Sequence, residues 1–209
     1  MKMKRLSFLL CAFSPLLFSC EKEPKIITET IFKTDTLYVT QYDTVVQVVT
    51  DTLTLTQFIR DTATTFIVLR HAETTGIGSD PALSADGQER ANELVRVLKN
   101  VVIGAVFSSN YNRTRQTAQS AAADQGLNVE IYDPLNQNPL INTVLSNHKG
   151  GAVLVVGHSN TAPALLNLLT GTNAYPQLPE SQYDNLFIVT VFEKGRAEVV
   201  HLKYGKPTP

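Results

Sequence analysis

The fold is decided by residues 65–74, TFIVLRHAET. The first half is a short apolar run, typical of a parallel strand that is buried on both faces. The second half places Arg70 and His71 directly where that strand should end. Ligands of α/β proteins gather at the carboxyl ends of parallel strands. This stretch therefore predicts a central strand that carries an arginine and a histidine to a site.

The rest of the chain continues an alternation of strands and helices. Apolar runs predict further strands at 105–107, 128–132 and 152–156. Between them, helical patterns follow the N-cap candidate Ser84, with an apolar face at 91, 94, 95 and 98, and span 112–124 and 160–169. A hairpin is expected from 186–192 and 198–202. The prediction is a three-layer αβα sandwich with a mostly parallel central sheet and a C-terminal antiparallel hairpin.

Composition limits the size and partners of the protein. Its 209 residues, 43% hydrophobic and 18% charged, suit one globular domain plus an appendage. The formal net charge of -1 provides no basic field, so nucleic acid is not an expected partner.

The N-terminus predicts export and a lipid anchor. Three basic residues precede the apolar run 6–18, which matches a signal peptide and is too short to span a membrane. The run ends at 17–20, LFSC, which resembles the lipobox of bacterial lipoproteins. We therefore expect a signal peptide at 1–19 and lipid attachment at Cys20, in the bacterial cell envelope at the outer membrane or periplasmic face. The alternative is an ordinary secretory signal with an incidental cysteine.

A Thr-, Asp- and Val-rich segment, 20–63, comes next and is interpreted as a stalk or linker. Its β-branched residues disfavour helix. One interpretation is a disordered spacer, and the other is a strand-forming stalk that self-associates. We place the globular domain at 64–205 and a short tail at 206–209.

Three polar motifs follow predicted strands. They are RHAET at 70–74, SSNYNRTRQTA at 108–118 and GHSN at 157–160. Each alone is more typical of a surface dipeptide, a helix cap or a tight turn. Together they bring two of the four histidines and at least two arginines to one rim.

The combination resembles the histidine phosphatase superfamily, also called the phosphoglycerate mutase-like family. The matching residues are 70–74, LSADG at 83–87, Ser109, Arg113, Thr114, QTA at 116–118, and Gly157 with His158. The resemblance implies that His71 is a nucleophile that becomes phosphohistidine. It also implies that Arg70, Arg113 and His158 surround the phosphoryl group.

The residue types suit that chemistry. Two guanidiniums supply fork-shaped donors for phosphoryl oxygens, and a neutral imidazole is a competent nucleophile near neutral pH. We expect Thr74, Ser159 and Asn160 to contribute to substrate binding. No metal and no cofactor is expected. A protonated His158 would add a third positive donor.

One departure concerns the general acid. Relatives with a defined acid carry a glutamate shortly after the third strand, where this chain has Gln137. An amide cannot protonate a leaving group. Three explanations stay open: Glu73 or Asp133 is the acid, the leaving group needs no proton, or turnover is slow. Glu73 could instead orient an arginine, and Asp133 could be a turn residue.

The expected function is phosphomonoester hydrolysis through His71 at the cell envelope. Arg113 and His158 are close in sequence, as in compact phosphohistidine phosphatases, so the pocket should be open. The substrate would be a small metabolite, a glycan phosphate or a phosphoprotein. The alternatives are a module that binds a phosphorylated ligand without turnover and, less favoured, a phosphoglycerate-type mutase.

Overall fold

The computed structural model describes residues 25–32, 44–49, 52–59 and 63–209. Two compact units divide the chain, with the boundary between Asp61 and Thr62. The signal peptide and Cys20, both predicted from sequence, lie outside the described residues. Within the described part of the chain, no helix has the length and apolar content needed to cross a bilayer.

The first unit contains a three-stranded antiparallel sheet. Its strands are β1 (Lys25–Phe32), β2 (Thr44–Val49) and β3 (Thr52–Ile59), in the order β1-β3-β2. These strands lie in the segment for which the sequence left a disordered spacer and a strand-forming stalk open. Self-association of this segment stays a prediction.

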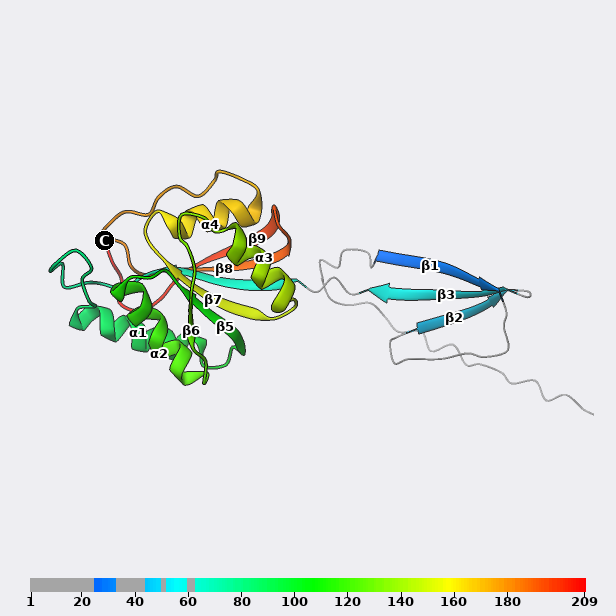
Figure 1. Ribbon diagram of the computed structural model, residues 1–209, viewed down its shortest axis with the longest axis horizontal. Helices are drawn as coiled ribbons and strands as arrows, with labels where there is room; N and C mark the ends of the chain where they lie inside the picture. The colour runs from blue at the N-terminus through cyan, green and yellow to red at the C-terminus, as the bar shows by residue number, and fades with distance from the viewer. Residues whose placement is uncertain (1–24, 33–43, 50–51, 60–62) are drawn as a thin grey trace, which may run out of the picture. The chain divides into compact units, whose positions relative to one another are not determined.

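The second unit has the predicted αβα architecture (Figure 1). A six-stranded sheet in the order β6-β5-β7-β4-β8-β9 is parallel from β6 to β4, and β8 and β9 are antiparallel. Its elements are β4 (Thr64–Arg70), α1 (Ala85–Leu98), β5 (Ile103–Ser108), α2 (Asn112–Asp124), β6 (Val129–Ile131), α3 (Asn138–Asn147), β7 (Ala152–Gly157), α4 (Thr161–Thr170), β8 (Asn185–Glu193) and β9 (Arg196–Lys203).

Strand β4 is central because both of its faces are apolar. Phe66 and Val68 pack in the core beneath α3 and α4, and Ile67 and Leu69 pack in the core against α1 and α2. Side chains alternate along a strand, so four consecutive apolar residues serve both cores. Each such side chain contributes about 1.5–3 kcal/mol by leaving water.

This arrangement positions the site. Strands β5, β7 and β4 are neighbours and parallel, so their carboxyl ends lie at one edge of the sheet. The polar motifs predicted to converge there begin at Arg70, Ser108 and Gly157, the last residues of those strands.

The sequence prediction did not include helix α3. It begins at Asn138 with Pro139 in its first turn, a position that proline favours because its missing N–H is not needed there. That proline was an available signal for a helix start.

Candidate active site

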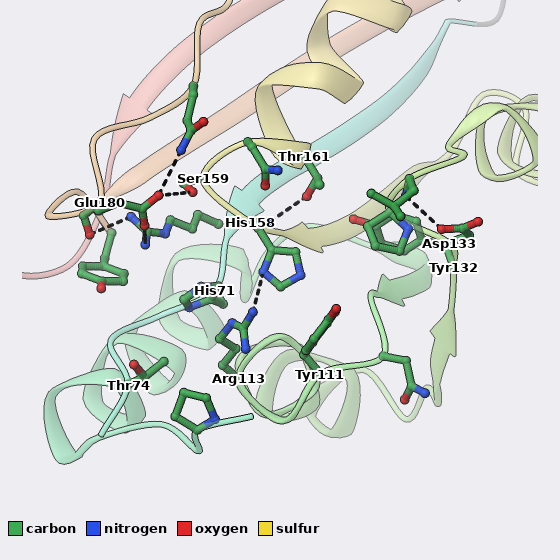
Figure 2. Close-up of a pocket in the computed structure, with 18 of the residues that line it drawn as sticks. His71, Thr74, Tyr111, Arg113, Tyr132, Asp133, His158, Ser159, Thr161 and Glu180 are labelled. Atoms are coloured by element: carbon green, nitrogen blue, oxygen red, sulfur yellow. Dashed lines mark hydrogen bonds and ion pairs between the residues drawn. The ribbon is translucent and has the colours of Figure 1, made fainter. Parts of the chain in front are cut away.

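A cavity of about 1070 Å³ opens at the carboxyl ends of the parallel strands. Figure 2 shows His71, Arg113 and His158 gathered at its centre. All seven residues predicted to act on or bind substrate, apart from Glu73, line this cavity: Arg70, His71, Thr74, Arg113, His158, Ser159 and Asn160.

His71 is buried and held in one tautomer. Its backbone N–H donates to the Gly157 carbonyl at 2.9 Å, and its ring Nδ1 lies 2.8 Å from the Ala72 carbonyl oxygen. Because a carbonyl only accepts, the hydrogen-bond network assigns the proton to Nδ1. The lone pair is therefore on Nε2. Burial, with a smaller contribution from nearby Arg70, lowers the pKa of His71 to about 3, against the opposing effect of the Ala72 hydrogen bond.

His158 follows Gly157, a position at which there is no room for a larger side chain. A Cβ on Gly157 would lie 2.8 Å from Thr161 Oγ1 and 3.0 Å from the Tyr132 hydroxyl. The same Thr161 hydroxyl accepts from the His158 backbone N–H at 2.9 Å. The turn after β7 is thus locked, and it places the His158 ring edge-on to His71 with centroids 5.5 Å apart.

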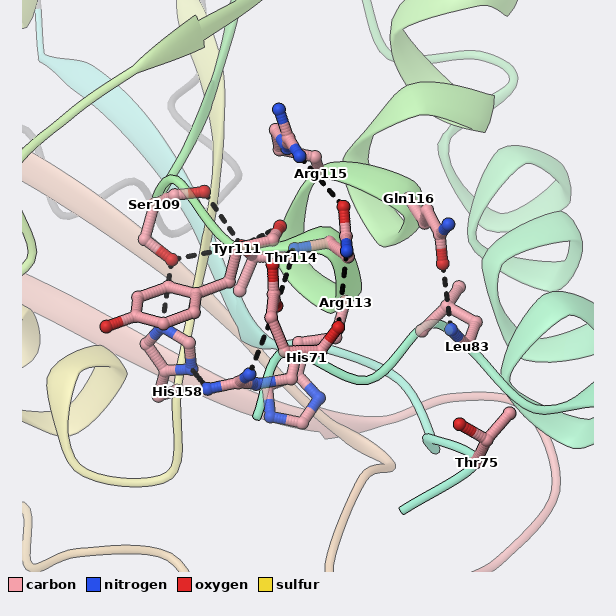
Figure 3. A network of polar contacts seen from close by, with 12 residues as sticks. His71, Thr75, Leu83, Ser109, Tyr111, Arg113, Thr114, Arg115, Gln116 and His158 are labelled. Atoms are coloured by element: carbon pink, nitrogen blue, oxygen red, sulfur yellow. Dashed lines mark hydrogen bonds and ion pairs between the residues drawn. The ribbon is translucent and has the colours of Figure 1, made fainter. Parts of the chain in front are cut away.

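A chain of hydroxyl groups fixes the His158 tautomer (Figure 3). Thr114 donates to the Ser109 carbonyl at 2.8 Å, and the Ser109 hydroxyl donates to Thr114 Oγ1 at 3.0 Å. His158 Nε2, 2.8 Å from Ser109 Oγ, is then the donor of that contact. Its Nδ1 accepts from Arg113 Nη2 at 3.4 Å.

His158 is neutral in this state. Burial, and after it the charges of Arg113 and Arg70, lower its pKa to about 4. Sequence analysis considered a protonated His158 as a third cation. The structure instead favours a neutral imidazole, because the ring is partly buried and two guanidiniums stand beside it. A bound phosphoryl dianion would favour its protonation.

Arg113 is oriented by Tyr111 and Asp80 as well as by its contact with His158. Its guanidinium carbon lies 4.6 Å from the centre of the Tyr111 ring, and its Nη1 lies 3.6 Å from Asp80 Oδ1. The Asp80 carboxylate also accepts from the Asn112 backbone N–H at 2.9 Å, which ties the segment before α1 to the start of α2. Sequence analysis had assigned Asp80 no role.

Arg70 anchors the segment between α4 and β8. Its Nη1 donates to the carbonyls of Pro179, Glu180 and Gln182 at 2.9–3.1 Å, and its guanidinium lies over the Tyr183 ring at 4.3 Å. Nη1 of Arg70 is therefore fully used in hydrogen bonds that hold this segment in place.

A carboxylate occupies the other side of Arg70. Glu180 Oε2 accepts from Arg70 Nη2 at 2.5 Å, and Glu180 Oε1 accepts from the Ser159 hydroxyl at 2.6 Å. The Ser159 hydrogen bond, followed by Arg70, lowers the pKa of Glu180 below its usual range despite some burial. Two groups predicted to bind phosphate are thus bound to a carboxylate of the chain itself.

The structure corrects one candidate acid. Glu73 does not line the cavity. Its carboxylate binds Arg90 through Nε and Nη2 at 2.7–3.1 Å. Burial raises the pKa of Glu73, but the Arg90 hydrogen bonds outweigh it and the net pKa is lowered. Orientation of an arginine, the alternative left open from sequence, is what the side chain does.

Gln137 and Asp133 both have structural partners. Gln137 is 4% exposed, and its Nε2 donates to the Thr161 carbonyl at 2.8 Å. Asp133 lines the cavity and accepts from the Leu135 backbone N–H at 2.9 Å, as in a turn. Within the described residues, no group of three or more His, Cys, Asp or Glu could hold a metal ion.

Comparison with known proteins identifies the family. The histidine phosphatase superfamily (branch 1) matches residues 66–138, which contain the motifs after β4 and β5. Residues 66–138 of the chain thus carry the sequence signature of the histidine phosphatase superfamily. No curated protein matches it.

Solved histidine phosphatases and related hydrolases share the fold. The protein histidine phosphatase SixA, complexed with tungstate, is 18% identical with a TM-score of 0.58, covering 66% of this chain and 96% of SixA. A mycobacterial glucosyl-3-phosphoglycerate phosphatase is 17% identical with a TM-score of 0.59, covering 68% of this chain and all of that one. Bacillus stearothermophilus YhfR is 18% identical with a TM-score of 0.54, covering 66% and 96%.

The residues that sequence analysis missed come from separate parts of the chain. Glu180 and Tyr183 lie in the segment between α4 and β8, outside every helix and strand. Tyr111 and Asp80 stand beside predicted residues and contact Arg113. Proximity to Arg113 in the motif was the available signal for Tyr111, and the remaining contacts depend on tertiary structure.

Proposed function

We propose that this protein hydrolyses phosphate monoesters through a covalent phosphohistidine on Nε2 of His71. One observation carries the proposal. The Nδ1 contact with Ala72 leaves the Nε2 lone pair free, in a cavity that Arg70, Arg113 and His158 also line. An imidazole lone pair surrounded by cationic donors suits attack on a phosphorus atom.

The first step forms the phosphoenzyme. His71 Nε2 attacks phosphorus, a P–N bond forms, and the ester P–O bond breaks with its electron pair leaving on the alcohol oxygen. Arg113, Arg70 and His158 place positive charge and N–H donors against the phosphoryl oxygens, where charge is distributed in the transition state, and Arg70 Nη2 becomes available once Glu180 releases it.

The second step hydrolyses the phosphoenzyme and regenerates the free enzyme. Water attacks the phosphorus, the P–N bond breaks, and inorganic phosphate leaves with the neutral imidazole restored. Because burial holds the pKa of His71 at about 3, its lone pair is available throughout the neutral range.

Intact mass spectrometry of the protein, quenched during incubation with 4-nitrophenyl phosphate, tests this proposal. We expect an adduct of one phosphoryl group, or steady phosphate release, in wild type and neither in His71→Ala. His201→Gln is the matched control, because His201 lies on β9 and does not line the cavity. Equal turnover by wild type and His71→Ala would overturn the proposal.

A second candidate is a module that binds phosphorylated ligands without turnover. It is favoured by Gln137 at the position where relatives carry the acid. Its signature would be a melting temperature raised by inorganic phosphate with no phosphate release from any monoester.

We also propose that the protein acts at the cell envelope, attached through lipid on Cys20. The basic start, the apolar run 6–18 and the LFSC sequence support this. Metabolic labelling with a tagged fatty acid, comparing wild type with Cys20→Ser, tests it. Labelling should be lost in the variant, and a variant that stays labelled would refute attachment at Cys20.

A further inference from the structure

We propose that the cavity selects phosphate monoesters of aromatic alcohols. This inference rests on the proposed function and concerns the part of the substrate beyond the phosphoryl group. It follows from two independent features: an exposed apolar wall beside the phosphate site, and the way the acidic and amide groups near the cavity are bound.

The apolar wall comes from two neighbouring strand ends. Tyr111 follows β5, and Ile131 and Leu135 lie at and after the end of β6. All three line the cavity, with exposures of 39%, 52% and 90%. Exposed apolar side chains cost free energy in water, and those gathered in a ligand cavity are typically covered by a ligand.

This wall begins next to the reacting groups. The Tyr111 ring stands edge-on to His158 with centroids 5.0 Å apart, and it lies against the Arg113 guanidinium at 4.6 Å. A phosphoryl group held by Arg113 and His158 would therefore carry its ester substituent past Tyr111. Flat rings pack well on an aromatic edge or face.

Another part of the cavity lining is polar. It includes Gln177 and Glu180, joined at 3.1 Å from Gln177 Nε2 to Glu180 Oε1. A polar hydroxylated substituent would find partners there, but an aromatic one is better matched to the side formed by Tyr111, Ile131 and Leu135.

The second feature concerns the proton. Two carboxyl groups, those of Asp133 and Glu180, line the cavity among the described residues. Each accepts hydrogen bonds: Asp133 from the Leu135 N–H, and Glu180 from Ser159, Arg70 and Gln177. Gln137 donates to Thr161, so neither it nor the carboxylates present a proton to the ester oxygen.

Aromatic alcohols do not need that proton. A phenol such as tyrosine has a pKa of about 10, far below that of an alkyl alcohol, so the phenolate leaves as a stable anion. As the P–N bond to His71 forms, the aryl P–O bond breaks, its electron pair stays on the phenolate, and solvent water then supplies a proton. An alkyl ester lacks this route and depends on general-acid catalysis.

Matched esters test the two features together. Phosphate release is measured for phenyl phosphate, cyclohexyl phosphate and methyl phosphate. The cyclohexyl group is similar in size to phenyl, but its alcohol is a poorer leaving group. The methyl group is too small to reach the apolar wall. We expect kcat/KM for phenyl phosphate to exceed that for cyclohexyl phosphate by about 10³-fold or more, because general-acid help contributes about 10²–10⁴-fold where it exists.

Variants separate the wall from the leaving group. Leu135→Ser should raise KM for phenyl phosphate by about three- to tenfold at nearly constant kcat, because apolar cover is lost from the bound ring. The ratio of kcat/KM for phenyl phosphate to kcat/KM for methyl phosphate should fall by the same factor. Val102→Ser is the control, since Val102 is 86% exposed and lies outside the cavity.

Binding gives a readout that is independent of turnover. Calorimetry with phenylphosphonate and methylphosphonate should show tighter binding of the phenyl compound, reduced by Leu135→Ser and unchanged by Val102→Ser. Equal affinities for the two phosphonates would overturn the inference, as would a cyclohexyl ester hydrolysed within tenfold of the phenyl ester.

The inference and the proposed function fail in different ways. Release from all esters, lost in His71→Ala but without aromatic preference, refutes the inference and keeps the hydrolase. No release from any ester refutes the hydrolase and with it the selection of a substrate.

Discussion

Burial keeps His71 neutral, and this couples the protonation of the proposed nucleophile to the stability of the fold. The side chain is among the buried polar residues, at 6% exposure, and its pKa falls from 6.5 to about 3 on folding. The unfolded chain binds the proton more readily, so stability is fully present above about pH 6.5 and is lost as pH falls toward 3.

Acidification should therefore destabilise wild type more than His71→Asn. Between about pH 7.5 and pH 5, His71 should remove about 2 kcal/mol from the free energy of unfolding, at about 1.36 kcal/mol for each pKa unit. Urea unfolding of both proteins at the two pH values measures this. Identical pH dependences would contradict it, and His201→Asn provides the control for loss of a more exposed histidine.

Gln137 is hydrogen-bonded to the backbone carbonyl of Thr161, so replacing it with glutamate should not supply a general acid to the reaction. In Gln137→Glu, an ionised carboxylate would face the Thr161 carbonyl without a proton to donate. We expect a loss of about 1–3 kcal/mol in the free energy of unfolding near pH 8. Stability should partly return at lower pH, because a protonated carboxyl can donate to that carbonyl and its pKa is raised on folding.

Measurements of activity show whether a glutamate at position 137 keeps this structural role or acts as a general acid. Hydrolysis of cyclohexyl phosphate by Gln137→Glu should stay within about threefold of wild type, because Gln137 does not line the cavity and its side chain is hydrogen-bonded to the Thr161 carbonyl. A gain above tenfold, with Gln88→Glu unchanged as the control, would mean that the new carboxyl group turns toward the substrate.

Sequence reasoning succeeded for residues directly attached to buried strands. Arg70, His71 and His158 follow apolar runs, and a strand end fixes where the next residue lies. Partners of the same residues were not predictable in this way. Glu180 reaches Arg70 across 110 positions of the chain, and only the tertiary path of the intervening segment brings them together.

At the scale of elements, the segment between α4 and β8 acts on the phosphate site through Glu180. Its carboxylate holds Arg70 Nη2 and the Ser159 hydroxyl, groups that a phosphoryl oxygen would also use. Bound phosphate must displace this carboxylate or lie beside it at an electrostatic cost.

Glu180→Gln should consequently tighten the binding of inorganic phosphate. We expect a dissociation constant lower by about three- to tenfold, because the competing charge is removed from a partly exposed ion pair. Calorimetry measures this, with Glu193→Gln as control: Glu193 also pairs with an arginine and has the same 68% side-chain exposure. Weaker phosphate binding would show that Glu180 supports the site instead of competing for it.

Helix α1 fixes the segment that follows the nucleophile. The Ser84 backbone N–H donates to the Glu73 carbonyl at 3.0 Å, and the Ser84 hydroxyl accepts from the Gly87 N–H at 3.2 Å. A Cβ on Gly87 would lie 2.1 Å from that Glu73 carbonyl oxygen. The LSADG sequence therefore gives a close contact between helix and loop as well as an N-cap.

Gly87→Ala should accordingly destabilise the protein although alanine favours helix. Steric overlap should cost about 1–3 kcal/mol, more than the gain of up to about 1 kcal/mol in helix propensity. Urea unfolding measures the change, and Glu89→Ala, at an exposed position of the same helix, controls for propensity. A more stable Gly87→Ala protein would show that the loop yields without cost.

At the scale of the whole molecule, the cavity of the described residues lies within one of the two units. Every residue that lines the cavity belongs to the unit Thr62–Pro209, and both apolar cores lie within it. On this proposal, the stalk segment and the predicted lipid anchor determine where in the cell the reaction takes place. The unit Thr62–Pro209 determines the rate of the reaction.

A protein shortened to residues 62–209 should fold cooperatively and keep kcat/KM for phenyl phosphate within about twofold of the full chain, because no side chain of the cavity is removed. Its activity should disappear with His71→Ala, which confirms that the same site is measured. The beginning at Thr62 matters, because Thr64 is only 1% exposed and accepts a hydrogen bond from the Gly150 N–H at 3.2 Å. A protein beginning at Phe66 would lose that contact and part of β4, and should have a lower melting temperature. If the 62–209 protein folds but loses more than tenfold in kcat/KM, the preceding segment contributes to the reaction itself.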